Sequence, residues 1–171
     1  AGTDNAPVML PFMNDYAALL RRQIVDGVQN GDRPLEGLHI VVDAGNGVGG
    51  FYADQVLEPL GADVSGSQFL EPDGMFPNHI PNPENKGAID AASKMVLDSS
   101  ADLGLIFDTD VDRMGCIGAT GQEINRNTLV ALAAAIVLED HPGTTVVTDS
   151  LTSDGLRTFI EQDLGGKQLR Y

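Results

Sequence analysis

The chain has 171 residues, enough for one ordinary domain or for one domain and part of another. Twenty-five acidic residues against ten basic ones give a net charge of -15, which excludes a nucleic-acid-binding or membrane-surface protein because phosphate backbones and anionic lipids are repelled. The single cysteine excludes an internal disulfide and a thiolate metal cluster, and no apolar run reaches membrane-spanning length. We therefore expect a soluble, intracellular protein.

The first elements follow from the spacing of apolar residues. Apolar side chains recur at helical spacing over residues 12–28, and Asn14 or Asp15 is the expected N-cap. A β-branched run at residues 38–42 indicates a buried strand, and a helix is predicted at residues 51–60 after a glycine-rich turn. The next expected elements are a strand, a proline-rich loop, a helix and a buried strand, at residues 63–69, 71–83, 86–97 and 103–107.

The character of the chain changes after Arg113. Residues 114–124 predict a β-hairpin that turns at Thr120 and Gly121. The helix expected at residues 128–139, capped by Asn127, is apolar on nearly every side and is predicted to be buried. A strand, a helix and a strand are then expected at residues 144–148, 153–162 and 167–171.

The alternation of strands and helices predicts an α/β fold class. We expect a layered α/β/α domain with a largely parallel mixed sheet at residues 1–115, followed by an incomplete second α/β unit at residues 116–171. The second unit has roughly 55 residues, too few to bury a core of its own comfortably. The chain does not begin with Met, so we expect it to start partway through a longer protein.

Residues 108–113, the acidic loop, follow the strand expected at residues 103–107. Asp108, Asp110 and Asp112 alternate along this loop, and in open α/β sheets ligands gather beyond the carboxyl ends of strands. Oxygen-only ligation suits Mg²⁺, so the three carboxylates predict a site for one such ion. Arg113 offers a planar fork for a phosphate or a carboxylate. The alternative is a solvated acidic turn in which Arg113 is the local counter-ion.

The acidic loop also resembles two other kinds of site, an EF-hand and the motif of a haloacid-dehalogenase-type phosphatase. An EF-hand is excluded, because Arg113 stands where a glycine is needed and Ala119 where a bidentate glutamate is needed. A haloacid-dehalogenase-type phosphatase would use Asp108 as nucleophile and Asp110 as acid/base. That motif normally opens its domain, whereas about a hundred residues precede it here. The residues of the loop alone therefore do not exclude the phosphatase interpretation.

Residues 45–50, the glycine turn, contain a second short motif. Gly45, Gly47 and Gly50 match the dinucleotide-binding pattern between a strand and a helix. However, Asp43 at the strand end would face the incoming pyrophosphate with a negative charge. We favour the interpretation that these glycines make a tight turn and let the helix pack closely on the sheet.

Four motifs, in this order and spacing, resemble those of the α-D-phosphohexomutases, the phosphoglucomutase and phosphomannomutase family. They are IVVDAGNGVGG, EPDGMFPNHIPNPEN, ADLGLIFDTDVDR and TVVTDSLTSDGL, and the likeness runs from about residue 16 to residue 171. Members of that family have four domains, and this chain resembles the complete second domain followed by the first part of the third.

The resemblance implies an enzyme that interconverts hexose 1-phosphates and 6-phosphates through a bisphosphate intermediate, with a phosphoserine in the first domain. It implies that Asp108, Asp110 and Asp112 bind one Mg²⁺ and that Asp112 and Arg113 lie near the transferred phosphate. The implied partners are a phosphorylated hexose and the remaining domains of the parent chain, with no nucleic acid and no membrane. The implied compartment is the cytoplasm or the plastid stroma.

This chain departs from the family pattern in the acidic loop. Thr109 and Val111 replace two glycines of the usual Asp-Gly-Asp-Gly-Asp-Arg, so either the loop does not need a positive φ there or it has shifted. The phosphoserine and sugar-binding loops of the family are absent from these residues, and Ser153 is no substitute, so we expect the chain alone to be inactive. We interpret His79 in the proline-rich loop as structural. The alternative for the parent is a pseudoenzyme that keeps the fold as a regulatory module.

Overall fold

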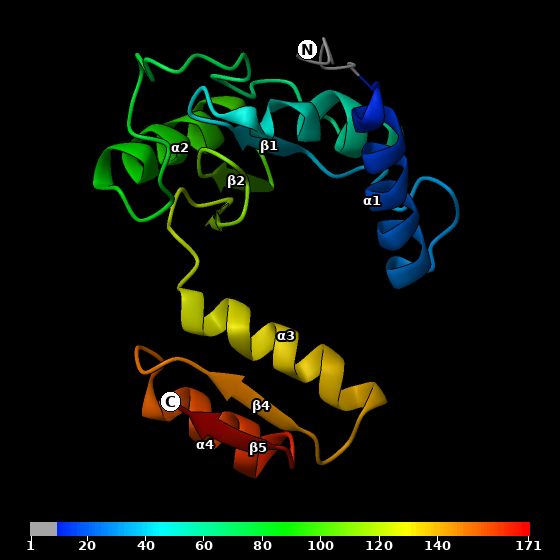
Figure 1. Cartoon of the computed structure of the whole chain (residues 1–171), viewed down its shortest axis with the longest axis vertical. Helices are drawn as coiled ribbons and strands as arrows, with labels where there is room; N and C mark the ends of the chain where they lie inside the picture. Colours follow the sequence, from blue (N-terminus) through cyan, green and yellow to red (C-terminus); the bar gives the residue numbers. More distant parts are fainter. Residues whose placement is uncertain (1–9) are drawn as a thin grey trace, which may run out of the picture. The chain divides into compact units, whose positions relative to one another are not determined.

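The computed structural model describes residues 10–171, which divide after Glu123 into two compact units (Figure 1). The sequence places the boundary after residue 115, but strand β3 (Met114–Gly118) pairs along its length with β2 and therefore belongs to the first unit. A turn closed by the bond from the Gly121 amide to the Gly118 carbonyl follows β3, as expected for the predicted hairpin. No helix within residues 10–171 has the length and apolar character needed to cross a membrane.

The first unit contains a three-stranded mixed sheet in the order β1-β2-β3. Strand β1 (Ile40–Asp43) runs parallel to β2 (Leu103–Phe107), and β3 runs antiparallel to β2. Residues 63–69, expected as a strand, run beside β1 but form two isolated bridges, at Asp63 and Gln68, instead of a continuous ladder. The reason is a turn in which Gly66 adopts φ +92° and the Ser67 hydroxyl, rather than a backbone carbonyl, accepts from the Val42 amide.

Helical segments cover both faces of this sheet, as predicted for an α/β/α domain. Side chains of β1 alternate between the faces, and all four of its residues are buried. Helix α2 (Lys86–Ser99) packs on one face, and η2 (Tyr52–Leu57) packs on the other. The buried residues of the α2 face are Val41, Ala88, Ala92, Met95, Val96, Ala101, Ile106 and Ile117. Those of the η2 face are Ile40, Val42, Ala44, Ala53, Leu57, Ala62 and Phe107.

Helix α1 (Phe12–Val28) has the predicted bounds but not the predicted cap. Its N-cap is Pro11, with no side-chain cap bond, and both Asn14 and Asp15 lie inside the helix. The helix expected at residues 51–60 is present but irregular: it consists mainly of the π-helix η2 followed by the 3-10 helix η3 (Glu58–Leu60), it ends at Gly61, and the 3-10 turn η1 (Val48–Gly50) precedes it. The inner face of α1 packs on this irregular helix around the buried residues Ala17, Val56 and Leu60.

The second unit is a small α/β layer structure of its own. Helix α3 (Arg126–Asp140) and the short helical segments α4 (Asp154–Thr158) and η4 (Phe159–Asp163) enclose a core with the parallel strands β4 (Thr145–Thr148) and β5 (Lys167–Arg170). The buried core residues are Ala134, Leu138, Leu156 and Ile160.

Two expectations for α3 were wrong. Its N-cap is Asn125, whose side chain accepts from the Asn127 amide, so the helix begins two residues earlier than predicted. It is also not buried all round, because the unit packs on one side of it only: Leu132 and Ile136 remain 58% and 59% exposed.

Candidate metal site

The acidic loop connects two adjacent antiparallel strands of the first unit. Phe107 at the end of β2 pairs with Met114 at the start of β3, so residues 108–113 form a hairpin loop of fixed length. Asp108 is 1% exposed, whereas Asp110 and Asp112 are exposed. Each aspartate offers one carboxylate oxygen, and these three oxygens all lie within 4.8 Å of one another. The sequence-predicted residues are therefore brought together.

Arg113 closes the acidic loop onto Asp108. The Asp108 amide donates to the Arg113 carbonyl (3.2 Å), and the Arg113 amide donates to Asp108 Oδ1 (3.1 Å). The guanidinium of Arg113 also contacts Asp108 Oδ2 through Nε at 3.2 Å and Nη2 at 3.1 Å, and its Nη1 lies 3.4 Å from Asn82 Oδ1. Since the Arg113 side chain is 52% exposed, part of its fork faces outward.

The carboxylates of the loop perturb one another. Burial raises the pKa of Asp108, but the hydrogen bond from the Arg113 amide, the contact with Asp112 and the Arg113 charge bring its pKa below the ordinary value. The contact with the Asp108 carboxylate and the charges of Asp108 and Asp110 raise the pKa of Asp112. A divalent cation would relieve this repulsion. The all-oxygen donor set also fits Mg²⁺ in kind.

Val111 adopts a backbone conformation that favours glycine, the residue that the family pattern has at this position. Its φ is +67°, which is a genuine outlier for a β-branched residue, while Thr109 is not in this region. Such strain costs on the order of 1–3 kcal/mol and persists only where the surroundings fix it. Here the partly buried Val111 side chain packs against the apolar cluster that contains Phe107. The loop therefore takes a positive φ at position 111 although the residue there is valine.

The glycine turn packs directly on the acidic loop. The Val48 amide donates to the Thr109 carbonyl (3.0 Å). The amides of Gly45 and Gly47 are also used internally, because they donate to the Asp43 carboxylate (2.9 Å) and the Ala44 carbonyl (2.7 Å). Amides that would bind a pyrophosphate in a dinucleotide site are thus engaged within the protein. This arrangement supports the close-packing interpretation of the glycines.

Sequence reasoning missed two contacts of the proline-rich segment, residues 71–83. His79, interpreted only as an ordered loop residue, pairs with the buried carboxylate of Asp43, and Asn82 meets Arg113. Both contacts join residues more than thirty positions apart. No local pattern signals either of them.

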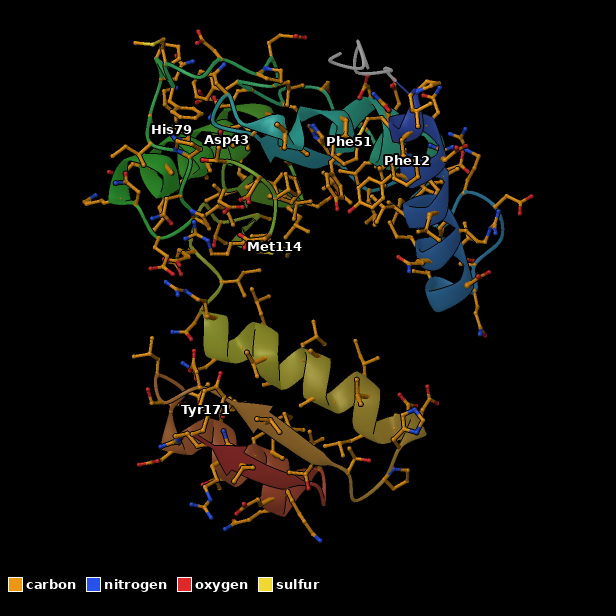
Figure 2. The ribbon with its side chains drawn as sticks, in the orientation of Figure 1. Phe12, Asp43, Phe51, His79, Met114 and Tyr171 are labelled. Carbon is orange, nitrogen blue, oxygen red and sulfur yellow. The ribbon has the colours of Figure 1, made fainter. Side chains whose placement is uncertain are left out.

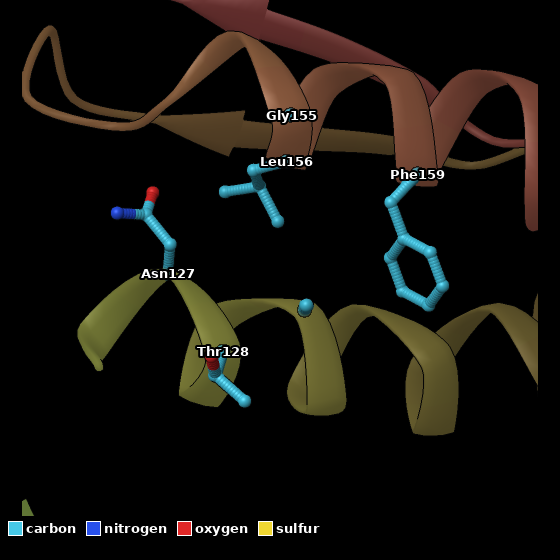
Figure 3. A pocket seen from close by; sticks show the side chains of 6 residues that line it. Asn127, Thr128, Gly155, Leu156 and Phe159 are labelled. Carbon is cyan, nitrogen blue, oxygen red and sulfur yellow. The ribbon is translucent and has the colours of Figure 1, made fainter. Parts of the chain in front are cut away.

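The second unit contains a shallow pocket with a volume of about 250 Å³. It lies between α3 and α4, and none of its lining residues is titratable (Figure 3). Those residues are Asn127, Thr128, Ala131, Gly155, Leu156 and Phe159. Because it lacks acid, base and metal-binding side chains, this pocket does not provide the chemistry of the acidic loop.

Fold and site together define an α/β domain with an acidic loop at the carboxyl end of a sheet strand. Residues 14–121 match the family model described as phosphoglucomutase/phosphomannomutase, alpha/beta/alpha domain II. This match covers well over half of the chain, and the chain belongs to that family. Membership replaces the haloacid-dehalogenase-type interpretation of Asp108, which depended on the local motif alone.

Similar proteins agree with this assignment. A phosphomannomutase/phosphoglucomutase of Pseudomonas putida is 39% identical over 134 residues, covering 78% of this chain and 28% of that protein. A phosphoglucomutase of Neisseria gonorrhoeae is 35% identical over 128 residues, covering 75% and 28%. The crystal structure of a phosphoglucomutase/phosphomannomutase family protein from Burkholderia thailandensis aligns with a TM-score of 0.75 at 30% identity, covering 89% of this chain and 33% of that one. The chain thus spans less than a third of the length of these curated relatives.

Proposed function

We propose that this chain forms the metal-binding part of a Mg²⁺-dependent phosphohexomutase, an enzyme that interconverts hexose 1-phosphates and 6-phosphates through a bisphosphate intermediate. The observation that carries the proposal is the convergence of Asp108, Asp110 and Asp112, whose carboxylate oxygens lie within 4.8 Å of one another at the end of β2. The names of the relatives, phosphomannomutase and phosphoglucomutase, support the reaction class.

In this proposal the three aspartates hold one Mg²⁺. When bound, the ion would offset the negative charge that builds up on the oxygens of a phosphoryl group during transfer. The chain needs such a cation, because a net charge of -15 otherwise repels a phosphorylated sugar. Arg113 directs the outer part of its guanidinium toward the phosphate, while its contacts with Asp108 and Asn82 hold it in place.

The proposal assigns the phosphoryl donor and the recognition of the sugar hydroxyls to other parts of a longer protein. We therefore expect the 171-residue chain to bind metal but not to convert glucose 1-phosphate. The test is a coupled assay that detects glucose 6-phosphate. Conversion by the pure chain would contradict this part of the proposal.

A second candidate is a pseudoenzyme that keeps the fold as a regulatory module. The observation in its favour is the strained Val111, where the family pattern has glycine. Against it, the strain is accommodated and the three carboxylates still converge. A phosphoserine loop in the parent chain supports the enzyme, and loss of that loop supports the module.

The metal assignment is tested by titrating the 171-residue chain with Mn²⁺, using the electron paramagnetic resonance signal of the free ion, and with Mg²⁺ in competition. Asp110→Asn should weaken binding by at least roughly tenfold, the lower end of what loss of even an outer-shell partner costs. Asp54→Asn is the control, since it removes the same charge from an exposed position in η2. Equal binding by the wild type and Asp110→Asn would leave the solvated acidic turn as the better interpretation.

A further inference from the structure

A buried carboxylate and a buried imidazole contact each other next to the glycine turn. Asp43, the last residue of β1, is completely buried, and the side chain of His79 is only 7% exposed. The Nε2 atom of His79 lies 3.0 Å and 3.1 Å from the two carboxylate oxygens of Asp43 (Figure 2). Buried ionisable groups need partners of this kind, because an unpaired one is costly in a low-dielectric interior.

Both ring nitrogens of His79 face hydrogen-bond acceptors, and the Asp43 carboxylate faces hydrogen-bond donors. Asp43 Oδ1 also accepts from the Gly45 amide (2.9 Å), and Oδ2 accepts from Gln68 Nε2 (2.8 Å), so the carboxylate is surrounded by donors. The other ring nitrogen of His79, Nδ1, lies 3.0 Å from the carbonyl oxygen of Ile80, which can only accept. An imidazolium that donates from Nε2 to an ionised Asp43 and from Nδ1 to the Ile80 carbonyl satisfies every one of these contacts.

This pair connects the proline-rich segment to the glycine turn, because His79 belongs to the former and Asp43 accepts from the Gly45 amide of the latter. Asn46 extends the connection: its carbonyl accepts from the Asp73 amide (2.9 Å), its Nδ2 donates to the Glu71 carbonyl (2.8 Å), and its Oδ1 accepts from Asn78 (2.7 Å). The contact between the two segments is close, since a Cβ atom at Gly45 would lie 2.9 Å from Pro81 Cβ.

Each of these two segments also makes its own hydrogen bond to the acidic loop. On one side the glycine turn supports it through the bond from the Val48 amide to the Thr109 carbonyl. On the other side the proline-rich segment supports it through Asn82 and the Arg113 guanidinium. One non-glycine residue with positive φ lies in each of the three segments: Asn46 in the glycine turn, Phe76 in the proline-rich segment and Val111 in the acidic loop. Such backbone strain is retained where contacts over-determine the conformation.

We propose that the Asp43–His79 ion pair positions the acidic loop, by holding the glycine turn and the proline-rich segment together beneath it. Asp43 and His79 are positioning residues in this inference, not catalytic ones, and the inference deepens the metal-binding function proposed above. A buried ion pair is by itself weak evidence for stability, since apolar replacement of both partners is often neutral. In this inference the pair fixes the local geometry of Thr109 and the three aspartates, whatever it contributes to the overall stability.

The test compares His79→Leu with His39→Leu in the 171-residue chain. His39 is the matched control, because it is the other histidine of the first unit and its ring contacts a backbone carbonyl, that of Ser65, instead of a buried carboxylate. His79→Leu should speed amide hydrogen exchange at Val48 by at least about tenfold, as expected when one partner of a buried pair is removed. Amides of β2 and β3 should change no more than in the control. His79→Gln, which can still donate to Asp43, should restore part of the protection.

Two further measurements complete the test. Nitrogen-15 NMR of the wild type should show both ring nitrogens of His79 protonated, and Mn²⁺ affinity should fall about three- to tenfold in His79→Leu, less than for a direct partner of a metal ligand. Unchanged exchange at Val48, a uniform change across β2 and β3, or a neutral His79 ring would overturn the inference. If the wild type binds no Mn²⁺, the proposed function fails, and exchange at Val48 still decides the positioning role.

Discussion

A Cβ atom at Gly47 would lie 2.8 Å from the carbonyl oxygen of Thr109, so the glycine turn and the acidic loop meet without room for a side chain. Gly47 does not have a positive φ, and its requirement is therefore one of space. The oxygen it faces is the same one that accepts from the Val48 amide.

The first prediction concerns this contact. Gly47→Ala should push Thr109 away, lower the free energy of unfolding by about 1–3 kcal/mol as overpacking does, and weaken Mn²⁺ binding. Urea denaturation and Mn²⁺ titration measure the two effects. Gly74→Ala is the control, because a Cβ at Gly74 meets nothing within 4 Å, and its change should stay within about 0.5 kcal/mol. A Gly47→Ala variant as stable as Gly74→Ala would show that the contact can relax freely.

The second prediction concerns Val111. Both Val111→Ala and Val111→Gly remove the packed side chain, but only glycine relieves the strain at φ +67°. Val111→Gly should therefore be more stable than Val111→Ala by about 1 kcal/mol, as judged from urea unfolding midpoints. The opposite order is expected at Ala133 in the exposed face of α3, where glycine should cost roughly 1 kcal/mol. If the alanine variant were the more stable one at position 111 as well as at position 133, the strain at Val111 would be contradicted.

The third prediction concerns the one cysteine of the chain. Burial raises the pKa of the Cys116 thiol, so the folded protein holds less thiolate than an exposed cysteine at the same pH. Reaction with a disulfide reagent at pH 8 should be slow in buffer and rapid in urea. Because the folded-state pKa lies above the unfolded one, its contribution to stability is present below about pH 8.5 and is lost as pH rises toward the folded value. Cys116→Ala should remove this dependence, and fast labelling of the native chain would contradict the burial of the thiol.

The fourth prediction tests which face of α3 stabilises the second unit. Leu138 is 5% exposed, and Leu138→Ala should lower the stability of this unit by about 2–5 kcal/mol. Leu132→Lys, on the exposed face of the same helix, should change it by no more than about 0.5 kcal/mol. Thermal unfolding followed by circular dichroism and amide exchange in α3 measure both. A large loss in Leu132→Lys would mean that this face is covered in solution.

Local patterns predicted some of these features well, for identifiable reasons. The apolar spacing of α1 and the uninterrupted apolar run of β2 are local signals, and both elements have the predicted bounds. The alternation of Asp108, Asp110 and Asp112 at a strand end predicted their convergence, since a short loop leaves carboxylates few other places to lie. Their role as metal ligands remains a prediction.

Other features depend on contacts between distant segments, which no local pattern encodes. The pairing of Asp43 with His79 spans 36 positions and requires the whole proline-rich segment to fold back on β1. Periodicity likewise predicted a buried α3, because it reports which residues are apolar and not how many faces of a helix find a neighbour. The strand expected at residues 63–69 is a different case, because Gly66 is of a type depleted in strands and so gave a local signal for the turn that interrupts it.

The pairing of Phe107 with Met114 has a consequence for how a cation would be captured. A six-residue connection closed at both ends keeps its like charges close to one another, because the paired strands fix where it begins and ends. Capture then needs little rearrangement of the chain, and the mutual repulsion already present is released as binding free energy. A bound divalent ion should consequently act as a clamp on the β2–β3 hairpin, and it should slow the separation of these two strands more than it slows opening anywhere else in the first unit.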